Sequence, residues 1–176
     1  MALLHTALII IDVQNGMFDE QFPVWNGDRL LTKIKNLLQK AREQNVPAFY
    51  VQHNEAAGLQ LESGTTAWEI HPDIKPLPMD HIIQKTRPDS FFETILEDEL
   101  AALNIKHVIL TGIQTDLCVD TTCRRANSLG YQVTVVADAH STFDSQNLSA
   151  EQIIAHHNET LQFFAEIKKA DEVDFR

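Results

Sequence analysis

The sequence predicts an α/β fold built on a parallel sheet. Short apolar runs rich in β-branched residues alternate with segments whose apolar residues recur at helical spacing. The runs at 7–11 and 108–110 contain no alternating polar residues, which is typical of strands buried on both faces. Strands that alternate with helices indicate βαβ units with right-handed crossovers.

Length and composition predict one domain over residues 1–176 and a soluble globular protein. The chain has 44% hydrophobic and 22% charged residues. The net charge of −11 argues against a nucleic-acid partner. No transmembrane run is present, and the apolar N-terminal stretch lacks the basic region and cleavage site of a signal peptide. Two cysteines five residues apart on one predicted helix cannot face each other, so we expect no disulfide and a reducing cytoplasm.

The first strand is predicted at 7–11, where the apolar run stops at Asp12. A loop over 16–27 follows, and a helix begins at Asp28. This helix is amphipathic, and its apolar face is expected to point inward. This face comprises Leu30, Leu31, Ile34, Leu37, Leu38 and Ala41. The helix ends near Pro47, and a second strand is predicted at 48–52.

The middle of the chain contains a long irregular segment, 54–79, with two glycines and three prolines. A connection of this length is usually functional or a lid. A short strand follows at 81–84 and ends at Lys85. We then expect a helix capped by Asp89 or Ser90. Its inward residues would be Phe91, Phe92, Ile95, Leu96, Leu100 and Leu103.

The segment 106–139 is predicted as strand, turn, helix and strand. The first strand covers 106–110, Thr115 or Asp116 is the expected N-cap, and Gly130 ends the helix. The turn brings Cys118 into the first turn of the helix, where unpaired N–H groups and partial positive charge would lower the pKa of its thiol. A buried structural cysteine is the plainer alternative.

The remaining elements complete the sheet. A strand is expected at 133–137 and a loop at 140–146. The segment Ser149-Ala150-Glu151-Gln152 matches a capping box and begins a helix that runs to about Gln162. The tail at 163–167 is expected to add a last short strand.

Three strands end in chemically reactive groups: Asp12, Lys85 and Cys118. Carboxyl ends of parallel strands share one sheet edge, so we expect these side chains to meet there. A thiolate can attack a carbonyl carbon, a carboxylate can take the thiol proton and later activate water, and an ammonium can hold both in their charged forms. Taken singly, the aspartate has a plainer explanation as a cap, and the lysine as a solvated side chain.

Three motifs in this order resemble those of the isochorismatase-like cysteine hydrolases, a family with nicotinamidases, N-carbamoylsarcosine amidases and isochorismatases. They are LIIIDVQNGMF, IIQKTRPDSFFETIL and GIQTDLCVDTTCRRANSLGYQV, and they extend the resemblance over nearly the whole chain. The resemblance implies a three-layer, Rossmann-like fold whose six-stranded parallel sheet has the order 3-2-1-4-5-6. It implies that Asp12, Lys85 and Cys118 are catalytic.

The resemblance also implies a cis peptide bond between Ile113 and Gln114. The backbone N–H groups of Gln114 and Cys118 would then form an oxyanion hole. The family usually forms dimers or tetramers, and four phenylalanines could supply apolar surface for a homodimer or homotetramer. These are Phe91, Phe92, Phe163 and Phe164.

The sequence departs from the metal-dependent members of the family. Their Asp-x-His pair at the end of the second strand is replaced here, with Gln52 in the first position. His53, Glu55 and His71 could still converge on a metal, but the missing carboxylate favours a metal-free enzyme with no cofactor. Nicotinamide becomes a less favoured substrate.

The substrate pocket is expected to be built from loops around the three reactive groups. Arg87 is a candidate for holding a substrate carboxylate. The other expected substrate-binding residues are Asn15, Met17, His53, Trp68 and Phe91, with Phe18 and Trp25 as further candidates.

The sequence also offers alternatives to an amidase acting on a small molecule. Cys118 and Arg124 have the spacing of cysteine phosphatases, but the five residues between them contain no glycine for a phosphate cradle. A vinyl-ether hydrolase of the isochorismate type and a non-catalytic interaction domain remain as alternatives. The intact catalytic positions argue against the interaction domain.

Overall fold

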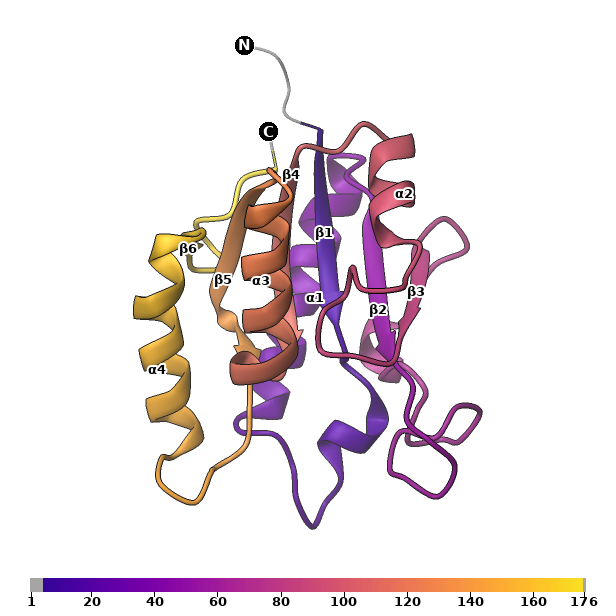
Figure 1. The fold of residues 1–176 in the computed structure, drawn as a ribbon, viewed down its shortest axis with the longest axis vertical. Coiled ribbons are helices and arrows are strands. Elements are labelled where there is room, and N and C mark those ends of the chain that lie inside the picture. Colours follow the sequence, from indigo (N-terminus) through magenta and orange to yellow (C-terminus); the bar gives the residue numbers. More distant parts are fainter. Residues whose placement is uncertain (1–4, 176) are drawn as a thin grey trace.

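The computed structural model describes residues 5–175 and contains a six-stranded, all-parallel sheet (Figure 1). The strands are β1 (Thr6–Ile11), β2 (Ala48–His53), β3 (His81–Lys85), β4 (His107–Ile113), β5 (Gln132–Ser141) and β6 (Glu166–Lys168). Their spatial order is β3-β2-β1-β4-β5-β6. The predicted α/β class and strand order are confirmed.

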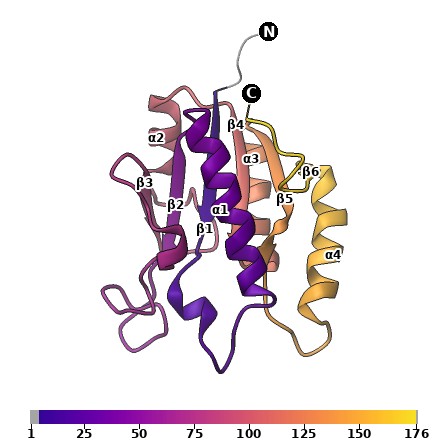
Figure 2. The same cartoon turned by 180° about the vertical axis from the view of Figure 1, so that it is seen from behind.

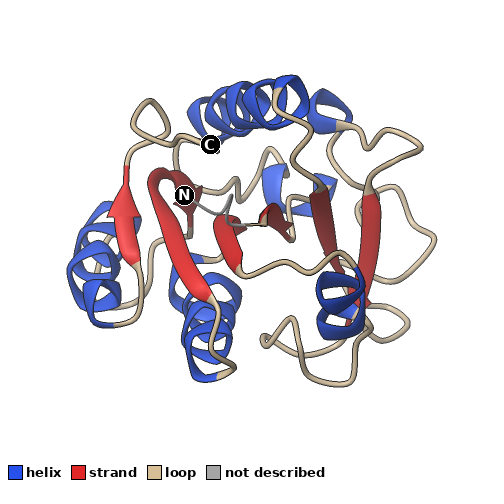
Figure 3. Ribbon diagram, turned by 90° about the horizontal axis from the view of Figure 1, so that it is seen from above, coloured by secondary structure: helices blue, strands red, loops and turns tan. Residues whose placement is uncertain are grey.

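Helices cover both faces of the sheet, which gives three layers (Figure 3). The helices are α1 (Gly27–Glu43), α2 (Leu96–Ala102), α3 (Asp120–Ser128) and α4 (Ala150–Thr160). In Figure 2 α1 crosses one face alone, while Figure 1 shows α2, α3 and α4 on the opposite side. Among the described residues no helix is long and apolar enough to cross a membrane.

The central strand β1 is buried along its entire length, as its continuous apolar sequence predicts. Its residues alternate between two cores: Leu8 and Ile10 pack with α1, and Ile9 and Ile11 pack on the face covered by α2 and α3. Burial on both sides fixes the register of β1 and therefore the position of Asp12, the next residue.

The helix expected directly after Pro88 begins later than predicted. α2 starts at Leu96, and Phe92 and Ile95 are exposed. Glu93 has a left-handed backbone with φ of 53°, which a continuous helix does not allow. Ser90 is buried and bonds to Thr122 instead of capping a helix.

The end of β5 also differs from prediction, since the strand continues past 137 and into the first two residues of the predicted loop, ending at Ser141. Pairing with β4 jumps from Leu110–Val135 to Gly112–His140, so β5 contains a bulge. The bulge re-aims the strand and buries His140 at the carboxyl edge of the sheet. The capping box of α4 is present as predicted, and Gly130 has the positive φ of 89° expected of a helix-ending glycine.

Candidate active site

The side chains of Asp12, Lys85 and Cys118 meet at the carboxyl edge of the sheet. Asp12 directly follows β1, Lys85 is the last residue of β3, and Cys118 lies in a π-helical turn, Thr115–Val119, between β4 and α3. Asp12 and Lys85 are almost completely buried, and Cys118 is partly exposed. Cys118 is therefore the least buried of the three residues.

The ammonium of Lys85 is the centre of this cluster. Its Nζ lies 2.7 Å from Asp12 Oδ2, 3.1 Å from Cys118 Sγ and 3.2 Å from His53 Nδ1. An ammonium has three N–H groups, so these three acceptors satisfy it completely. His53 also belongs to this cluster, because it pairs with Lys85 in the register between β2 and β3.

The charge states follow from burial and from the neighbouring groups. Burial by itself would lower the pKa of Lys85, but its interactions with Asp12 and Cys118 outweigh burial and raise that pKa, so the lysine is protonated at neutral pH. Burial and the charge of Lys85 lower the pKa of His53. Its ring is therefore neutral at pH 7, with Nδ1 accepting from Lys85 and the proton on Nε2.

The resting state of Cys118 differs from the prediction. Burial and the adjacent Asp12 carboxylate raise the pKa of its thiol to about 12, with Lys85 acting in the opposite direction. The expected lowering by a helix N-terminus was wrong, because burial and a neighbouring negative charge dominate. Cys118 is therefore a thiol at neutral pH and needs a base to become a nucleophile.

Asp12 has one carboxylate oxygen available for that purpose. Oδ2 is paired with Lys85, whereas Oδ1 is buried and has no hydrogen-bond partner among residues 5–175. The backbone of Asp12 is held by a 2.9 Å bond from its N–H to the carbonyl of Val51. A buried carboxylate oxygen with a free lone pair beside a thiol is placed to accept a proton.

The turn that carries Cys118 depends on an unusual backbone. Gly112 has a φ of 122°, and a Cβ there would overlap the main chain of Ile11. The peptide bond between Ile113 and Gln114 is cis. Neither predicted N-cap acts as one: Thr115 bonds through Oγ1 to His140, and Asp116 accepts a bond from Thr142.

Two buried glutamines that were not predicted fix the long segment 54–79 beside the site. Gln14 donates to the carbonyls of His53 and Trp68 and accepts from the N–H of His53. Gln52 also donates to the Trp68 carbonyl, at 2.9 Å. Gln52 therefore has a structural task at the position where metal-dependent relatives carry a ligand. The available signal in the sequence was a glutamine close to the end of each of the first two predicted strands.

The predicted pocket residues separate into two groups. His53 and Arg87 line an open cavity of about 500 Å³, which adjoins the cluster through His53 and is not lined by Asp12, Lys85 or Cys118. The other residues around it are Asn54, Glu55, Ala56, Leu59 and Thr86. The second group has mainly structural contacts. Asn15 donates to the Thr66 carbonyl, Trp68 donates to Asn54, Met17 and Phe18 pack on the α1 core, and Phe91 is buried and stacks with Tyr131.

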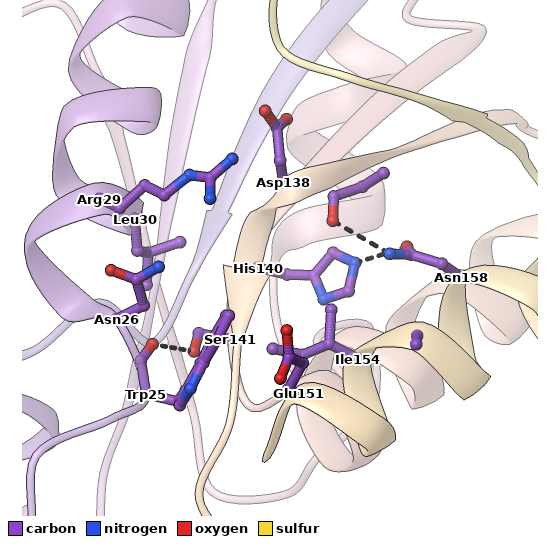
Figure 4. A pocket seen from close by; sticks show the side chains of 12 residues that line it. Trp25, Asn26, Arg29, Leu30, Asp138, His140, Ser141, Glu151, Ile154 and Asn158 are labelled. Atoms are coloured by element: carbon purple, nitrogen blue, oxygen red, sulfur yellow. Dashed lines mark hydrogen bonds between the residues drawn. The ribbon is translucent and has the colours of Figure 1, made fainter. Parts of the chain in front are cut away.

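A second cavity, of about 250 Å³, lies between α1 and α4 (Figure 4). Trp25 lines this cavity together with His140 and Asn158. Neither Asp12, Lys85 nor Cys118 contributes to its lining. The prediction that Trp25 lies in the pocket beside the cysteine is therefore not supported.

The possible metal ligands do not converge as the sequence allowed. Within residues 5–175 the only such group is Asp12, His53 and Cys118, whose ligand atoms lie within 4.8 Å of one another. Glu55 instead accepts from the N–H of Leu61, and His71 packs against Phe18. The ammonium of Lys85 contacts all three members of the group, so their lone pairs already face a positive charge.

Comparisons with known proteins identify the family. A family model described as the isochorismatase domain matches residues 6–167. A streptothricin hydrolase of Streptomyces noursei is 32% identical over 78% of this chain and 50% of its own, so the chain spans half the length of that relative. Nicotinamidase 3 of Arabidopsis thaliana is 30% identical over 80% of this chain and 75% of its own.

A solved structure agrees with these similarities. The crystal structure of an isochorismatase from Pseudomonas putida KT2440 superposes with a TM-score of 0.91 at 28% identity and covers 99% of this chain and 92% of that one. The match of the family model over most of the chain confirms the resemblance seen in the motifs. The chain belongs to the isochorismatase family of hydrolases.

Proposed function

We propose that the protein is a metal-free cysteine hydrolase that cleaves a small amide or related C–N bond. The observation that carries the proposal is the ammonium of Lys85 in simultaneous contact with Asp12 and Cys118, at 2.7 and 3.1 Å. Nucleophile, base and cation are then within reach of one reacting carbonyl. The similarity to a nicotinamidase supports an amide as the substrate class.

In the proposed reaction Asp12 accepts the thiol proton of Cys118, and the thiolate attacks the carbonyl carbon of the substrate. Lys85 stabilises the negative charge that the thiolate and Asp12 share. The backbone N–H groups of Gln114 and Cys118 are proposed to bind the oxyanion. The tetrahedral intermediate expels the amine, which takes the proton from Asp12, and leaves a thioester on Cys118.

The second half of the reaction restores the enzyme. Asp12, again a carboxylate, takes a proton from water, and the hydroxide attacks the thioester carbon. Collapse of this intermediate releases the carboxylic acid, and the sulfur regains its proton. The Asp12 carboxylate thus acts as the base in each half of the reaction, for which its buried and unpaired Oδ1 is suited.

Substrate binding is proposed to use the cavity beside His53. Its neutral ring can donate from Nε2, and Arg87 can pair with an anionic group of the substrate. Asn15, Met17, Trp68 and Phe91 shape the surrounding loops and core. We further propose that the enzyme works in the reducing cytoplasm as a homodimer or homotetramer.

The test is ammonia release from a panel of small amides and N-carbamoyl compounds. Cys118→Ala should reduce turnover by at least about 10³-fold, because the covalent route is lost. Cys123→Ala is the matched control, since Cys123 is a buried cysteine in α3 and should be dispensable for chemistry. Turnover should survive EDTA.

Other outcomes would change the proposal. Loss of turnover in EDTA and its recovery with zinc would contradict a metal-free mechanism. Absence of turnover on amides, together with Cys118-dependent cleavage of a vinyl ether, would favour the isochorismate-type reaction. Wild-type activity in Cys118→Ala would exclude the cysteine mechanism.

A further inference from the structure

His140 links the helix α4 to the turn that carries Cys118. It lies near the end of β5 and is only 4% exposed. Its Nδ1 is 2.8 Å from Oγ1 of Thr115. Its Nε2 is 2.9 Å from Oδ1 of Asn158, a contact drawn in Figure 4. Both ring nitrogens of a buried histidine are therefore engaged by groups from different elements.

The contacts of Asn158 determine the direction of both hydrogen bonds to His140. The amide nitrogen of Asn158 donates to the backbone carbonyl of Ala137 at 3.0 Å, so its oxygen faces the histidine. Nε2 must then carry the proton and donate to that oxygen. Burial lowers the pKa of His140 to about 4, so the ring is neutral at pH 7 and Nδ1 is an acceptor. The hydroxyl of Thr115 donates to it.

This arrangement fixes the first residue of the nucleophile turn. Thr115 begins the π-helical turn, and Cys118 follows three residues later. The carbonyl of Gln114, just before the turn, accepts from the N–H groups of Leu117 and Val119. The position of Thr115 therefore determines where the sulfur stands relative to Lys85.

We propose that His140 is a positioning residue for Cys118, acting through its Nδ1 and the hydroxyl of Thr115. The inference rests on the proposed role of Cys118 as the nucleophile. The helix α4, through Asn158, holds the ring and selects the tautomer. The bulge in β5, which places His140 opposite Gly112, is what brings the ring to the nucleophile turn.

Two amide substitutions separate the two ring nitrogens. In His140→Asn the amide oxygen can take the place of Nδ1 and keep the bond to Thr115. In His140→Gln the amide nitrogen can take the place of Nε2 and keep the bond to Asn158. A merely structural role would make the two variants equivalent, whereas the positioning role predicts that only His140→Asn retains a reactive cysteine.

The first readout is alkylation of Cys118 by iodoacetamide at pH 9, followed by mass spectrometry of its peptide, which requires no substrate. His140→Gln and Thr115→Val should slow alkylation by about tenfold, since a shift of ~1 Å at a reacting group can change its rate by up to ~100-fold. His140→Asn and Thr115→Ser should stay within about threefold of wild type. His156→Gln, an exposed histidine of α4, is the matched control.

Once a substrate is found, the slowed variants should lose kcat with KM within about twofold, because the binding cavity is untouched. Equal alkylation rates in all four variants, or slowing in His140→Asn but not in His140→Gln, would overturn the proposal. If His140→Gln does not fold, as judged by circular dichroism, Thr115→Val against Thr115→Ser decides alone. A failure of Cys118→Ala to abolish turnover would refute the proposed function without affecting the alkylation result.

Discussion

The charge state of Cys118 is decided by its neighbours at the scale of single residues. Burial raises the pKa of the thiol most, the Asp12 carboxylate raises it further, and the Lys85 ammonium lowers it. The residue types and their strand-end positions were predictable from sequence, because the apolar runs end in them. The sign of the pKa shift was not, because it depends on burial and on the distances of Cys118 from Lys85, 33 positions away, and from Asp12, which is much farther away in the sequence.

Removing Asp12 and removing Lys85 should shift the pKa of the Cys118 thiol in opposite directions. Asp12→Asn removes a negative charge, so the pKa of Cys118 falls and more thiolate is present at pH 9. Lys85→Met removes the positive charge, so the pKa rises and less thiolate is present. Alkylation of Cys118 should become about tenfold faster in Asp12→Asn and slower by a similar factor in Lys85→Met.

Both variants should nevertheless lose turnover, because Asp12→Asn removes the base and Lys85→Met removes the balancing cation. Rates measured between pH 7 and 11 compare the thiolate fraction of the variants with that of wild type, and Asp116→Asn controls for a nearby charge that bonds to Thr142 instead. Slower alkylation in Asp12→Asn would show that the carboxylate does not oppose thiolate formation in the resting protein.

At the scale of elements, the site depends on how β1 and β4 approach each other. Ile11 pairs with Gly112, and a side chain at Gly112 would overlap backbone atoms of Ile11. The sequence predicted that a strand ended near this glycine, since the apolar run stops there. It did not predict that β4 continues to Ile113, nor that Glu93 delays α2, because both depend on backbone conformations without an apolar signature.

Gly112→Ala should therefore be far more damaging than an alanine at another positive-φ glycine. Gly130 has a φ of 89°, but no atom lies within 4 Å of a Cβ built there. Gly130→Ala should lower the free energy of unfolding by about 1–2 kcal/mol through backbone strain alone. Gly112→Ala adds a clash with β1 and should lose more than about 4 kcal/mol or fail to fold.

Urea denaturation of the two variants beside wild type measures this difference. If alanine lowers the free energy of unfolding equally at both positions, Gly112 is not needed for the close approach of β1 and β4. A folded Gly112→Ala protein with normal Cys118 alkylation would lead to the same conclusion.

At the scale of the whole molecule, the parallel sheet and its two cores follow from patterns that sequence displays well. The meeting of the reactive strand-end residues at one place also follows, because the carboxyl ends of parallel strands share one edge of the sheet. The pocket was less predictable. Gln14 and Gln52 fix the segment 54–79 through contacts to main-chain carbonyls, and such contacts leave no periodic signal. Phe91 shows the converse problem, since an aromatic residue near the motif proved to be buried core.

Association of the protein is the remaining prediction at this scale. Of the four phenylalanines expected to provide apolar surface, Phe91 is buried and Phe164 lies beneath Arg124, whose guanidinium is 4.4 Å from the ring centroid. Phe92 and Phe163 are exposed, and Phe163, just after α4, is 87% exposed. Phe163 is the most exposed large apolar side chain among residues 5–175, so we use it to test the proposed dimer or tetramer.

We therefore expect light scattering after size exclusion to give at least twice the chain mass of 19.9 kDa. Phe163→Ser should shift the protein toward the monomer, because burial of one phenylalanine per subunit contributes about 1.5–3 kcal/mol to association. Phe22→Ser, which removes a phenylalanine that is 76% exposed in the connection before α1, should leave the mass unchanged. A wild-type protein that stays at the monomer mass over a range of concentrations would contradict the predicted dimer or tetramer. An unchanged oligomer in Phe163→Ser would place the interface elsewhere.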